Sequence, residues 1–157
     1  MDDSNWPIFE VDQHIVAHGR YYAGKIGSRF FTALRDEKKI LGIRCPHCGV
    51  VLWPPRATCR DCFSQLGLED MEEIGPQGIL ESFTIVTYKE PIQPRTPPFI
   101  VGIVRLNGAS CGMTHFIDEV AHDEVKIGMR VTAVFAEHRQ GHIMDISHFK
   151  PVRFSTD

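Results

Sequence analysis

The sequence lacks long apolar runs, repeats and biased segments. None of its 157 residues belongs to a run of about 18 apolar residues, the length that crosses a bilayer as a helix. The opening residues, Met1 to Pro7, show neither the basic nor the apolar part of a secretion signal. We therefore expect a soluble, cytoplasmic protein with one modest core.

The patterns that identify most enzyme active sites are also missing. There is no Gly-rich phosphate loop and no dinucleotide fingerprint. Three histidines fall in segments expected to be strands, where a histidine is more often a hydrogen-bonded sheet residue than a catalyst: His115, His142 and His148. The acid pairs Asp118-Glu119 and Asp123-Glu124 are most simply a solvated surface. We predict no catalytic residue, so a stand-alone hydrolase or hydratase is the least supported function.

Cysteine is scarce, but four of the five cysteines form two Cys-x-x-Cys pairs. Cys45-Pro46-His47-Cys48 and Cys59-Arg60-Asp61-Cys62 are separated by ten residues, a spacing that lets four thiolates converge on one tetrahedral Zn²⁺. Gly49 follows the first pair, where a residue without Cβ can take the left-handed conformation that ends such a turn. Four sulfur ligands leave no open position, so the predicted zinc is structural.

Other interpretations of the cysteines stay open. Iron in a rubredoxin-like site uses the same ligand pattern. Two disulfides would need an oxidising compartment, which the opening residues do not suggest. We interpret His47 as a solvated turn residue rather than a fifth ligand. The fifth cysteine, Cys111, is interpreted as a small buried hydrophobic residue rather than a reactive thiol.

Charge is nearly balanced overall, with a formal net charge of −3, but it is unevenly distributed. Residues 1–19 carry −4, residues 20–60 carry +7 and the remainder carries −6. Arg44, Arg56 or Arg60 could offset the negative charge of a four-thiolate zinc centre. The rest of the basic segment predicts an anionic partner: nucleic acid, the phosphates of a nucleotide-like cofactor, or an acidic protein surface.

Residues 14–41 have the apolar spacing of a helix. Four apolar side chains recur at every fourth position and would line one face: Tyr22, Ile26, Phe30 and Leu34. Gly24 and Gly27 favour a break near residues 24–28. The apolar face could pack internally or meet another protein, and the sequence leaves both possibilities open.

Five segments after residue 78 are predicted to be strands, because each is bounded by Gly, Pro or Asn turn signals. They are Ile79 to Tyr88, Phe99 to Leu106, Ser110 to Phe116, Arg130 to Glu137 and His142 to Phe149. Asn107-Gly108 predicts a type I′ hairpin between the second and third strands. Residues 117–129 could hold the short helix of an OB-fold, and the Pro-rich residues 90–98 should form a stiff loop.

Together these segments resemble the zinc-ribbon plus OB-fold proteins associated with acyl-CoA metabolism, over nearly the whole chain. The specific residues are Arg44-Cys45-Pro46-His47-Cys48-Gly49, Trp53-Pro54-Pro55-Arg56 and the strand from Pro97-Pro98 to Leu106. Arg60-Asp61 departs from the proline that many relatives carry in the second pair, which alters local charge but leaves all four ligands intact. The resemblance implies an α+β fold with an N-terminal helical segment (1–41), a rubredoxin-like zinc ribbon (42–74) and a five-stranded OB-fold barrel (75–157).

The resemblance also implies a function. Family members are typically small subunits bound to thiolases or related acyl-CoA enzymes. We therefore predict a non-catalytic or co-catalytic accessory subunit of a β-ketoacyl-CoA thiolase, in a hetero-oligomer whose catalytic cysteine lies on the large subunit. The candidate pathway is the anaerobic degradation of aromatic compounds through benzoylsuccinyl-CoA.

Basic side chains near the ribbon are the candidates for holding the phosphates of CoA or acyl-CoA, since phosphate binding rewards positive charge and Arg adds bidentate geometry. They are Arg29, Arg35, Lys38, Lys39, Arg44 and Arg56. The alternative is a nucleic-acid-binding module, a use common to zinc ribbons and OB-folds. Two features oppose it: the net −6 of residues 61–157 and the expectation that the barrel aromatics fill the core, namely Phe83, Phe99, Phe116, Phe135 and Phe149.

Overall fold

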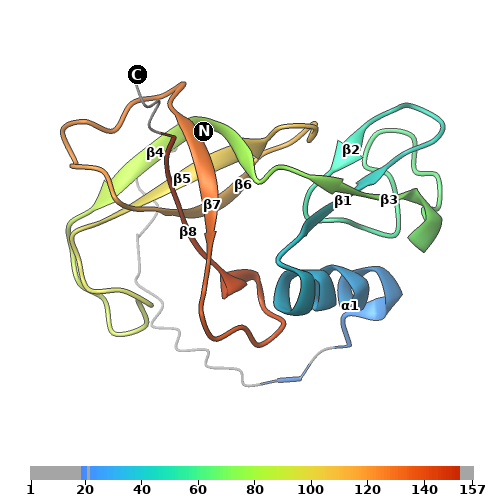
Figure 1. The fold of residues 1–157 in the computed structure, drawn as a ribbon, viewed down its shortest axis with the longest axis horizontal. Coiled ribbons are helices and arrows are strands. Elements are labelled where there is room, and N and C mark those ends of the chain that lie inside the picture. Colours follow the sequence, from blue (N-terminus) through green and yellow to red (C-terminus); the bar gives the residue numbers. More distant parts are fainter. Residues whose placement is uncertain (1–18, 21, 153–157) are drawn as a thin grey trace, which may run out of the picture.

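The fold was analysed in a computed structural model that describes residues 19, 20 and 22–152. A helix and a small three-stranded sheet lie beside a five-stranded closed barrel (Figure 1). The predicted α+β class, with a ribbon followed by a five-stranded OB-type barrel, is therefore confirmed. The part of the predicted helical segment that covers residues 14–18 and 21 lies outside the described residues.

The helix is shorter than predicted. Helix α1 spans Gly24–Thr32 and continues as a π-helical turn over Ala33–Glu37. Lys38 takes the left-handed conformation (φ 53°) after this turn, and strand β1 begins at Ile40, so the expected continuation to residue 41 is wrong. The expected break near residues 24–28 is also wrong, because Gly24 (φ +69°) begins the helix and Gly27 lies within it.

Three of the four residues of the predicted apolar face pack internally. The exposed fractions of Ile26, Phe30 and Leu34 are 8%, 2% and 0%. Phe30 and Leu34 belong to the same buried cluster as the barrel residues, whereas Ile26 packs in the ribbon. Tyr22 precedes the helix and is 91% exposed, so it is the residue of this face that remains available to a partner.

The ribbon is an antiparallel three-stranded sheet in the order β2-β1-β3. Strand β1 spans Ile40–Arg44, β2 spans Val51–Leu52 and β3 spans Met71–Ile74. A 3₁₀ turn, Leu68–Asp70, leads into β3. The loops that carry the cysteines leave and re-enter this sheet, so the sheet fixes their relative positions.

The barrel contains all five predicted strands, with ends shifted by at most four residues. Its strands are β4 (Gln77–Val86), β5 (Phe99–Leu106), β6 (Met113–Ile117), β7 (Arg130–Phe135) and β8 (Ile146–Pro151). Their order is β4-β5-β6-β8-β7, and β7 pairs with β4 to close the barrel. The β6–β8 pair is parallel and the others are antiparallel, which is the OB-fold arrangement.

The connection between β5 and β6 differs from the predicted tight hairpin. The strands are antiparallel neighbours as expected, but Val104 pairs with Met113, so the connecting loop is long. Of the two turn residues only Gly108 has a positive φ (+90°), which excludes type I′. The ribbon determines this geometry: Ser110 N donates to Val51 O (2.9 Å) and Val51 N donates to Ser110 Oγ (3.0 Å).

Two further segments differ from prediction. Residues 118–129 form turns without the short helix, because Ala121 O accepts from both Glu124 N and Val125 N and the Val125 side chain then turns into the core. The last strand begins at Ile146 instead of residue 142. A 3₁₀ turn, Ile143–Asp145, precedes it, and the buried Asp145 carboxylate accepts backbone N–H bonds from Gln140, Gly141 and His142.

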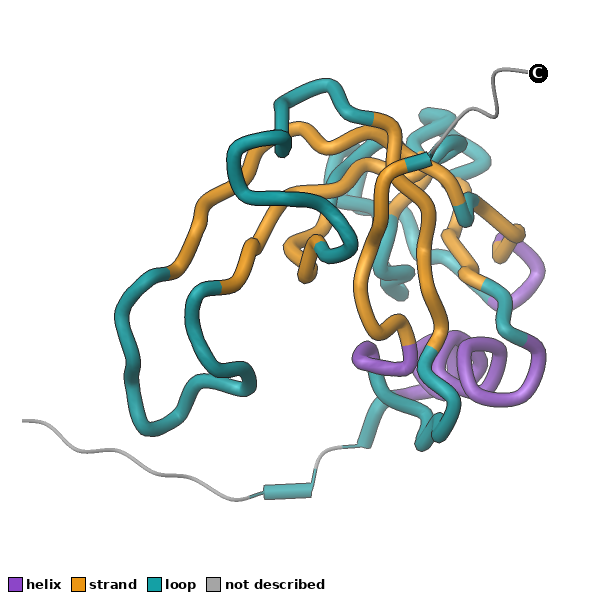
Figure 2. The backbone as a smooth tube through the Cα atoms, turned by 60° about the vertical axis from the view of Figure 1, so that its left-hand side comes forward, coloured by secondary structure: helices purple, strands orange, loops and turns teal. Residues whose placement is uncertain are grey.

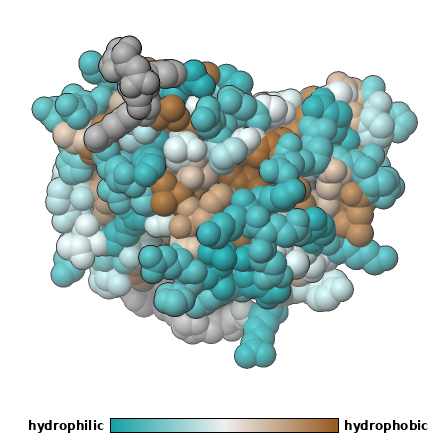
Figure 3. All heavy atoms as spheres, in the orientation of Figure 1, coloured by the Kyte–Doolittle hydropathy of each residue, from teal (hydrophilic) through white to brown (hydrophobic). Residues whose placement is uncertain are grey.

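The helix, ribbon and barrel all contribute to one large apolar core, and the ribbon has a second, smaller core of its own. Trp53, two residues after the start of β2, packs edge-on against Phe149 of β8, with ring centroids 6.3 Å apart. Arg139 Nε, in the loop after β7, donates to Arg35 O of the π-helical turn (2.7 Å). The two predicted domain boundaries, at residues 41/42 and 74/75, stay a prediction, since this core crosses them. On the face in Figure 3, brown apolar atoms form a band between polar side chains.

The Pro-rich segment is a loop, as predicted. Residues 87–98 join β4 to β5 and extend well away from the barrel (Figure 2). Arg95 anchors this loop: Nη1 bonds Asp118 Oδ2 (3.1 Å), Nη2 donates to Ser147 O (3.0 Å), and Cζ lies 4.0 Å from the centre of the Phe116 ring. Within the described part of the chain, no helix has the length and apolar character needed to cross a membrane.

Candidate metal centre and basic surface

The first cysteine pair lies in a tight loop between β1 and β2. Cys45 N donates to Val50 O (2.8 Å) and Gly49 N donates back to Cys45 O (2.9 Å). Gly49 has φ +75°, so the predicted left-handed glycine is confirmed. These bonds fold the chain back on itself and place both thiols on the same side of the loop.

The second pair repeats this design. Cys59 N donates to Ser64 O (2.9 Å) and Phe63 N donates to Cys59 O (3.1 Å). Phe63 occupies the position that Gly49 holds in the first pair and has φ 59°, although it carries a large side chain that is 75% exposed. Backbone geometry, rather than glycine itself, is what the two loops have in common.

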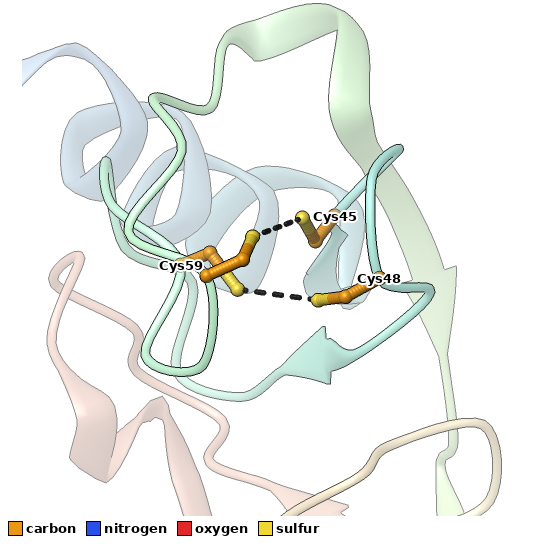
Figure 4. A group of neighbouring side chains, drawn as sticks. Cys45, Cys48 and Cys59 are labelled. Atoms are coloured by element: carbon orange, nitrogen blue, oxygen red, sulfur yellow. Dashed lines mark hydrogen bonds between the residues drawn. The ribbon is translucent and has the colours of Figure 1, made fainter.

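The four sulfur atoms converge on one point. All four Sγ atoms lie within 4.8 Å of one another, and Cys45–Cys62 and Cys48–Cys59 are each 3.5 Å apart. Figure 4 shows Cys45 and Cys48 facing Cys59 across this space. A tetrahedral Zn–S₄ centre has S···S edges of about 3.8 Å, whereas a disulfide is about 2.05 Å long. The geometry therefore fits one metal ion and not two disulfides.

Ser64 supports the thiolate form of two ligands. Its Oγ lies 3.2 Å from Cys45 Sγ and 3.0 Å from Cys62 Sγ. This hydroxyl is the main reason why the pKa of each thiol is lowered, and backbone N–H groups of the loops act in the same direction. Because metal binding requires thiolates, these contacts favour the form that the metal needs at Cys45 and Cys62, whereas the Val50 N–H is outweighed at Cys48 by desolvation and the neighbouring thiols, which raise the pKa of Cys48 to about 12.

His47 is placed as expected, whereas Cys111 is only partly the buried apolar residue that the sequence suggested. His47 is exposed and lies outside the four-sulfur group. Cys111 is half-buried, and its Sγ contacts the backbone of Trp53 on both sides, at 3.4 Å from N and 3.3 Å from O. Cys111 thus joins the β5–β6 loop to the ribbon, which a purely apolar residue could not do.

Four of the six basic candidates form ion pairs. Each pairs with a carboxylate from the π-helical turn or from β3, at N–O distances of 2.5 to 2.9 Å: Arg29–Glu37, Arg35–Asp36, Lys39–Glu73 and Arg44–Glu72. All four pairs are substantially exposed to solvent. Exposed pairs contribute at most about 1 kcal/mol, so a phosphate could compete for these cations. The positive charge of the segment is nevertheless largely neutralised locally.

The side chains of Lys38 and Arg56 differ from those of the other four, because neither has an ion-pair or hydrogen-bond partner among the described residues. Arg56 borders two cavities. One, of 350 Å³, lies between the start of α1 and the ribbon. The other, of 540 Å³, lies where the ribbon meets the barrel and is also lined by Arg60, Cys111 and Thr114. Volumes of this size are typical of small-molecule sites.

Arg60 was not among the residues predicted to bind an anion. Its position inside the second cysteine pair pointed instead to a role beside the metal. In the structure it pairs with its neighbour Asp61 (3.1 Å) and also lines the 540 Å³ cavity with Arg56. The sequence spacing could not predict that Arg60 lines this cavity, because the cavity is also formed by the β5–β6 loop and β6, about 50 residues further along the chain.

Three of the five barrel aromatics fill or border the core as predicted, whereas Phe99 and Phe116 lie outside the core cluster and line an apolar cavity. Phe149 is fully buried and Phe116 is 9% exposed, while Phe83 and Phe135 pack against the core from its edge. Phe99 stacks edge-on against Phe116 at 5.7 Å between ring centroids. Few ring faces are therefore free to stack on bases, which weakens the nucleic-acid interpretation.

His115 lies on β6 beneath the surface of the barrel and is 5% exposed. Desolvation lowers its pKa to about 4. Nδ1 accepts from Phe116 N (2.9 Å), which places the proton of the neutral ring on Nε2, 3.5 Å from Ile143 O. This is the hydrogen-bonded sheet histidine that was expected. His142, by contrast, lies before β8 and caps the 3₁₀ turn through Nδ1.

The fold and the four-cysteine site define the class of this protein: a rubredoxin-like zinc ribbon joined to an OB-fold barrel. Two family models match the chain. Residues 32–69 match the ChsH2 rubredoxin-like zinc ribbon domain, and residues 71–136 match the ChsH2 C-terminal OB-fold domain. The two matches together cover more than half of the chain, so it belongs to the ChsH2 zinc-ribbon plus OB-fold family. Four clustered cysteines in a zinc ribbon domain support a structural zinc.

Two curated relatives are called DUF35 domain-containing scaffold proteins. One, from Methanocaldococcus jannaschii, is 26% identical over 82% of this chain and 92% of its own length. The other, from Methanothermobacter thermautotrophicus, is 27% identical over 71% of this chain and 83% of its own length. Both alignments span most of each protein, so the likeness concerns the whole arrangement of ribbon and barrel.

Two solved structures share the fold. The Ltp2-ChsH2(DUF35) aldolase matches with a TM-score of 0.63 and 21% identity, over 84% of this chain and 98% of that chain. A DUF35-family protein of unknown function from Sulfolobus solfataricus matches with a TM-score of 0.58 and 24% identity, over 71% and 78%. At these identities the matches confirm the fold and leave the activity to other evidence.

Proposed function

We propose that this chain is an accessory subunit of an acyl-CoA enzyme complex, with a thiolase as the first candidate partner. The observation that carries the proposal is the closed metal centre. Because all four ligands are cysteines, the metal has no open position and stabilises a platform instead of activating a substrate. The relatives described as scaffold proteins support a role in organising another chain.

An aldolase is the second candidate partner. One structural neighbour with this fold is the Ltp2-ChsH2(DUF35) aldolase. Thiolases and CoA-dependent aldolases both handle CoA thioesters, so the platform would serve either enzyme in the same way. In both cases the reacting groups, including the catalytic cysteine of a thiolase, belong to the large subunit.

Within this proposal, Arg56 and Arg60 beside the 540 Å³ cavity help to bind the phosphates of CoA. Arg56 has no acidic partner among the described residues, and Arg60 pairs only with its exposed neighbour. Arg29, Arg35, Lys39 and Arg44 would first have to give up their carboxylates. The cavity would therefore contribute more binding energy than the paired cations.

Co-purification from the native source tests the partner. A thiolase-sized or aldolase-sized chain recovered in a fixed ratio, together with CoA binding that only the complex shows, would support the proposal. Activity assays on that complex with benzoylsuccinyl-CoA test the candidate substrate. A chain that purifies alone and never affects the activity of either enzyme would contradict the proposal.

Titration of CoA into the complex tests the site. Arg56→Gln should weaken CoA binding more than Arg29→Gln, with a loss of about tenfold for one charge-assisted bond. Arg105→Gln is the matched control, because Arg105 lies on β5 and pairs with Glu81. Equal affinity in the Arg56→Gln and control complexes would remove this cavity from the proposal. A salt-dependent gel shift with single-stranded DNA or RNA would favour the nucleic-acid alternative instead.

A further inference from the structure

A cavity of 300 Å³ lies where the barrel strands β6 and β8 separate. Among the described residues these two strands pair only at Ile117 and Phe149. The part of β6 before Ile117 therefore borders the 3₁₀ turn Ile143–Asp145 across the cavity, and the Pro-rich loop adds Pro94 to the wall. Of the lining residues only Thr114 also borders the 540 Å³ cavity, so this is a separate candidate site.

The lining of this cavity is largely apolar. Its apolar side chains come from β5, β6, the Pro-rich loop and the 3₁₀ turn: Phe99, Val101, Phe116, Pro94, Ile143 and Met144. Within the part of the chain that the structure describes, no charged side chain lines it. Arg95 lies over the ring of Phe116, but its guanidinium is already bonded to Asp118 and to Ser147 O. An ionised ligand would lose its hydration here without a replacement.

His115 places one buried hydrogen-bond donor at the wall of the cavity. Its side chain is 5% exposed, and desolvation lowers its pKa to about 4, so the ring is neutral near pH 7. Nδ1 accepts from Phe116 N, and Nε2–H is left with Ile143 O at 3.5 Å. Most N–H···O bonds measure about 2.9 to 3.0 Å, so this one is weak. A better acceptor at Nε2 would therefore be stabilising.

The volume and the donor together favour one kind of ligand. Benzene fills an apolar cavity of about 150 Å³, so 300 Å³ has room for a ring, a carbonyl group and a short substituent. An apolar side chain of a partner protein would fill the space but leave the His115 N–H with its long bond. A carboxylate would find no free cation. A neutral carbonyl group satisfies the donor and tolerates the apolar walls.

We propose that this cavity binds an uncharged carbonyl compound with an aromatic or alicyclic ring, whose oxygen accepts a hydrogen bond from His115 Nε2. The ring lies among the apolar side chains of β5 and β6. The remainder of the ligand leaves past Met144, which is 38% exposed. The inference concerns the isolated chain and is independent of the proposed partner enzyme.

Titration of small probes into the full-length chain, prepared with zinc and followed by amide NMR near neutral pH, tests the proposal. Acetophenone has the ring and the carbonyl, ethylbenzene lacks the acceptor, and benzoate adds a charge. Acetophenone should cause saturable shifts at residues 99–101, 114–116 and 143–144 and at the Nε2–H of His115. Ethylbenzene should bind about tenfold more weakly, through loss of one hydrogen bond, and benzoate should not saturate.

Two variants separate the donor from the space around it. His115→Phe keeps a ring but removes the donor, so acetophenone and ethylbenzene should bind it equally. Met144→Trp fills the cavity from its partly exposed edge and should abolish the binding of both probes. It leaves His115 unchanged, so it tests the site even if His115→Phe does not fold. The matched control is Ile103→Trp, because Ile103 is 40% exposed on the same face of β5 as Val101 but lies outside this cavity.

The same chemistry is found in a free ketone and in the acyl end of a thioester. Competition between acetophenone and S-benzoyl-N-acetylcysteamine distinguishes these sources. Displacement of acetophenone by a lower concentration of the thioester would support the site as one for acyl groups. Displacement only by a higher concentration would support it as one for free ketones.

Three results would overturn the proposal. Equal affinity of the wild type for acetophenone and ethylbenzene would mean that the donor is not used, and the cavity would then suit an apolar side chain of a partner protein. Saturable binding of benzoate at the same residues would contradict the requirement for an uncharged ligand. The absence of saturable shifts with acetophenone, or a loss of binding in Ile103→Trp equal to that in Met144→Trp, would remove the site altogether.

Discussion

The ribbon and the barrel are stabilised in different ways. The barrel surrounds a large apolar core, to which the helix, Trp53 and Val51 also contribute. The separate core of the ribbon has six buried members, and two of these, Cys45 and Cys59, belong to the four-cysteine cluster. A small sheet cannot bury enough apolar surface by itself, so the metal replaces the missing core. The comparison predicts that the two regions respond differently to the same treatments.

Loss of a buried ligand should have the largest effect. Cys45→Ser removes a thiolate that is fully buried, and zinc binding in comparable small domains is worth roughly 10 kcal/mol or more. We expect loss of stoichiometric zinc in elemental analysis and rapid amide exchange across β1–β3, with β4–β8 retained. Cys111→Ser is the control, because Cys111 lies outside the sulfur cluster. A zinc-free variant with unchanged ribbon exchange would refute the metal's structural role.

Truncation in the barrel core should come next. Phe149 is fully buried and contacts the rings of both Trp53 and His115. Phe149→Ala should lower the free energy of unfolding by about 3–5 kcal/mol, through lost burial and the cavity left behind. Denaturant unfolding measures the loss. Zinc content under native conditions should stay stoichiometric, since no ligand is altered; a loss of zinc would show that the two regions unfold as one unit.

Acidification should weaken the barrel through His115. Its pKa is lowered from 6.5 to about 4, so between these values the unfolded chain binds a proton that the folded chain does not. The contribution of the neutral ring to the free energy of unfolding is fully present above pH 6.5 and is lost as the pH falls towards 4. The total loss is about 3 kcal/mol at most. In His115→Gln this part of the pH dependence should be absent. Acid also releases zinc, so the difference between the wild type and the variant is the quantity to compare.

The smallest effect should come from the backbone of the second cysteine loop. Phe63 holds a left-handed conformation that glycine adopts in the first loop, and its exposed side chain adds little burial. Phe63→Gly should raise the free energy of unfolding by about 0.5–1 kcal/mol. Gly49→Ala should lower it by a similar amount. A destabilised Phe63→Gly variant would mean that the exposed ring makes contacts that outweigh the strain.

Much of the fold could be predicted from sequence because its signals are local. The Cys-x-x-Cys spacing identifies the ligands since each pair is one short loop, and Gly49 marks the turn. Strand β5 has the predicted bounds because turn signals flank it on both sides. The predictions are wrong where contacts outside the local sequence pattern determine the backbone. The conformation of the β5–β6 loop is set by its hydrogen bonds to the ribbon instead of by its Asn-Gly pair. The start of β8 is set by the turn that the Asp145 carboxylate stabilises.

The basic segment shows the same division. Its charge is a property of the sequence, but the neutralisation of Lys39 and Arg44 depends on Glu73 and Glu72 of β3, which the β1–β3 pairing brings alongside. The sequence by itself pointed to the four cysteines that cluster, the order of ribbon and barrel, and the core positions of Phe30, Leu34 and Phe149. The tertiary structure alone decided which cations keep free charge and where cavities form, because both depend on which distant strands pack together.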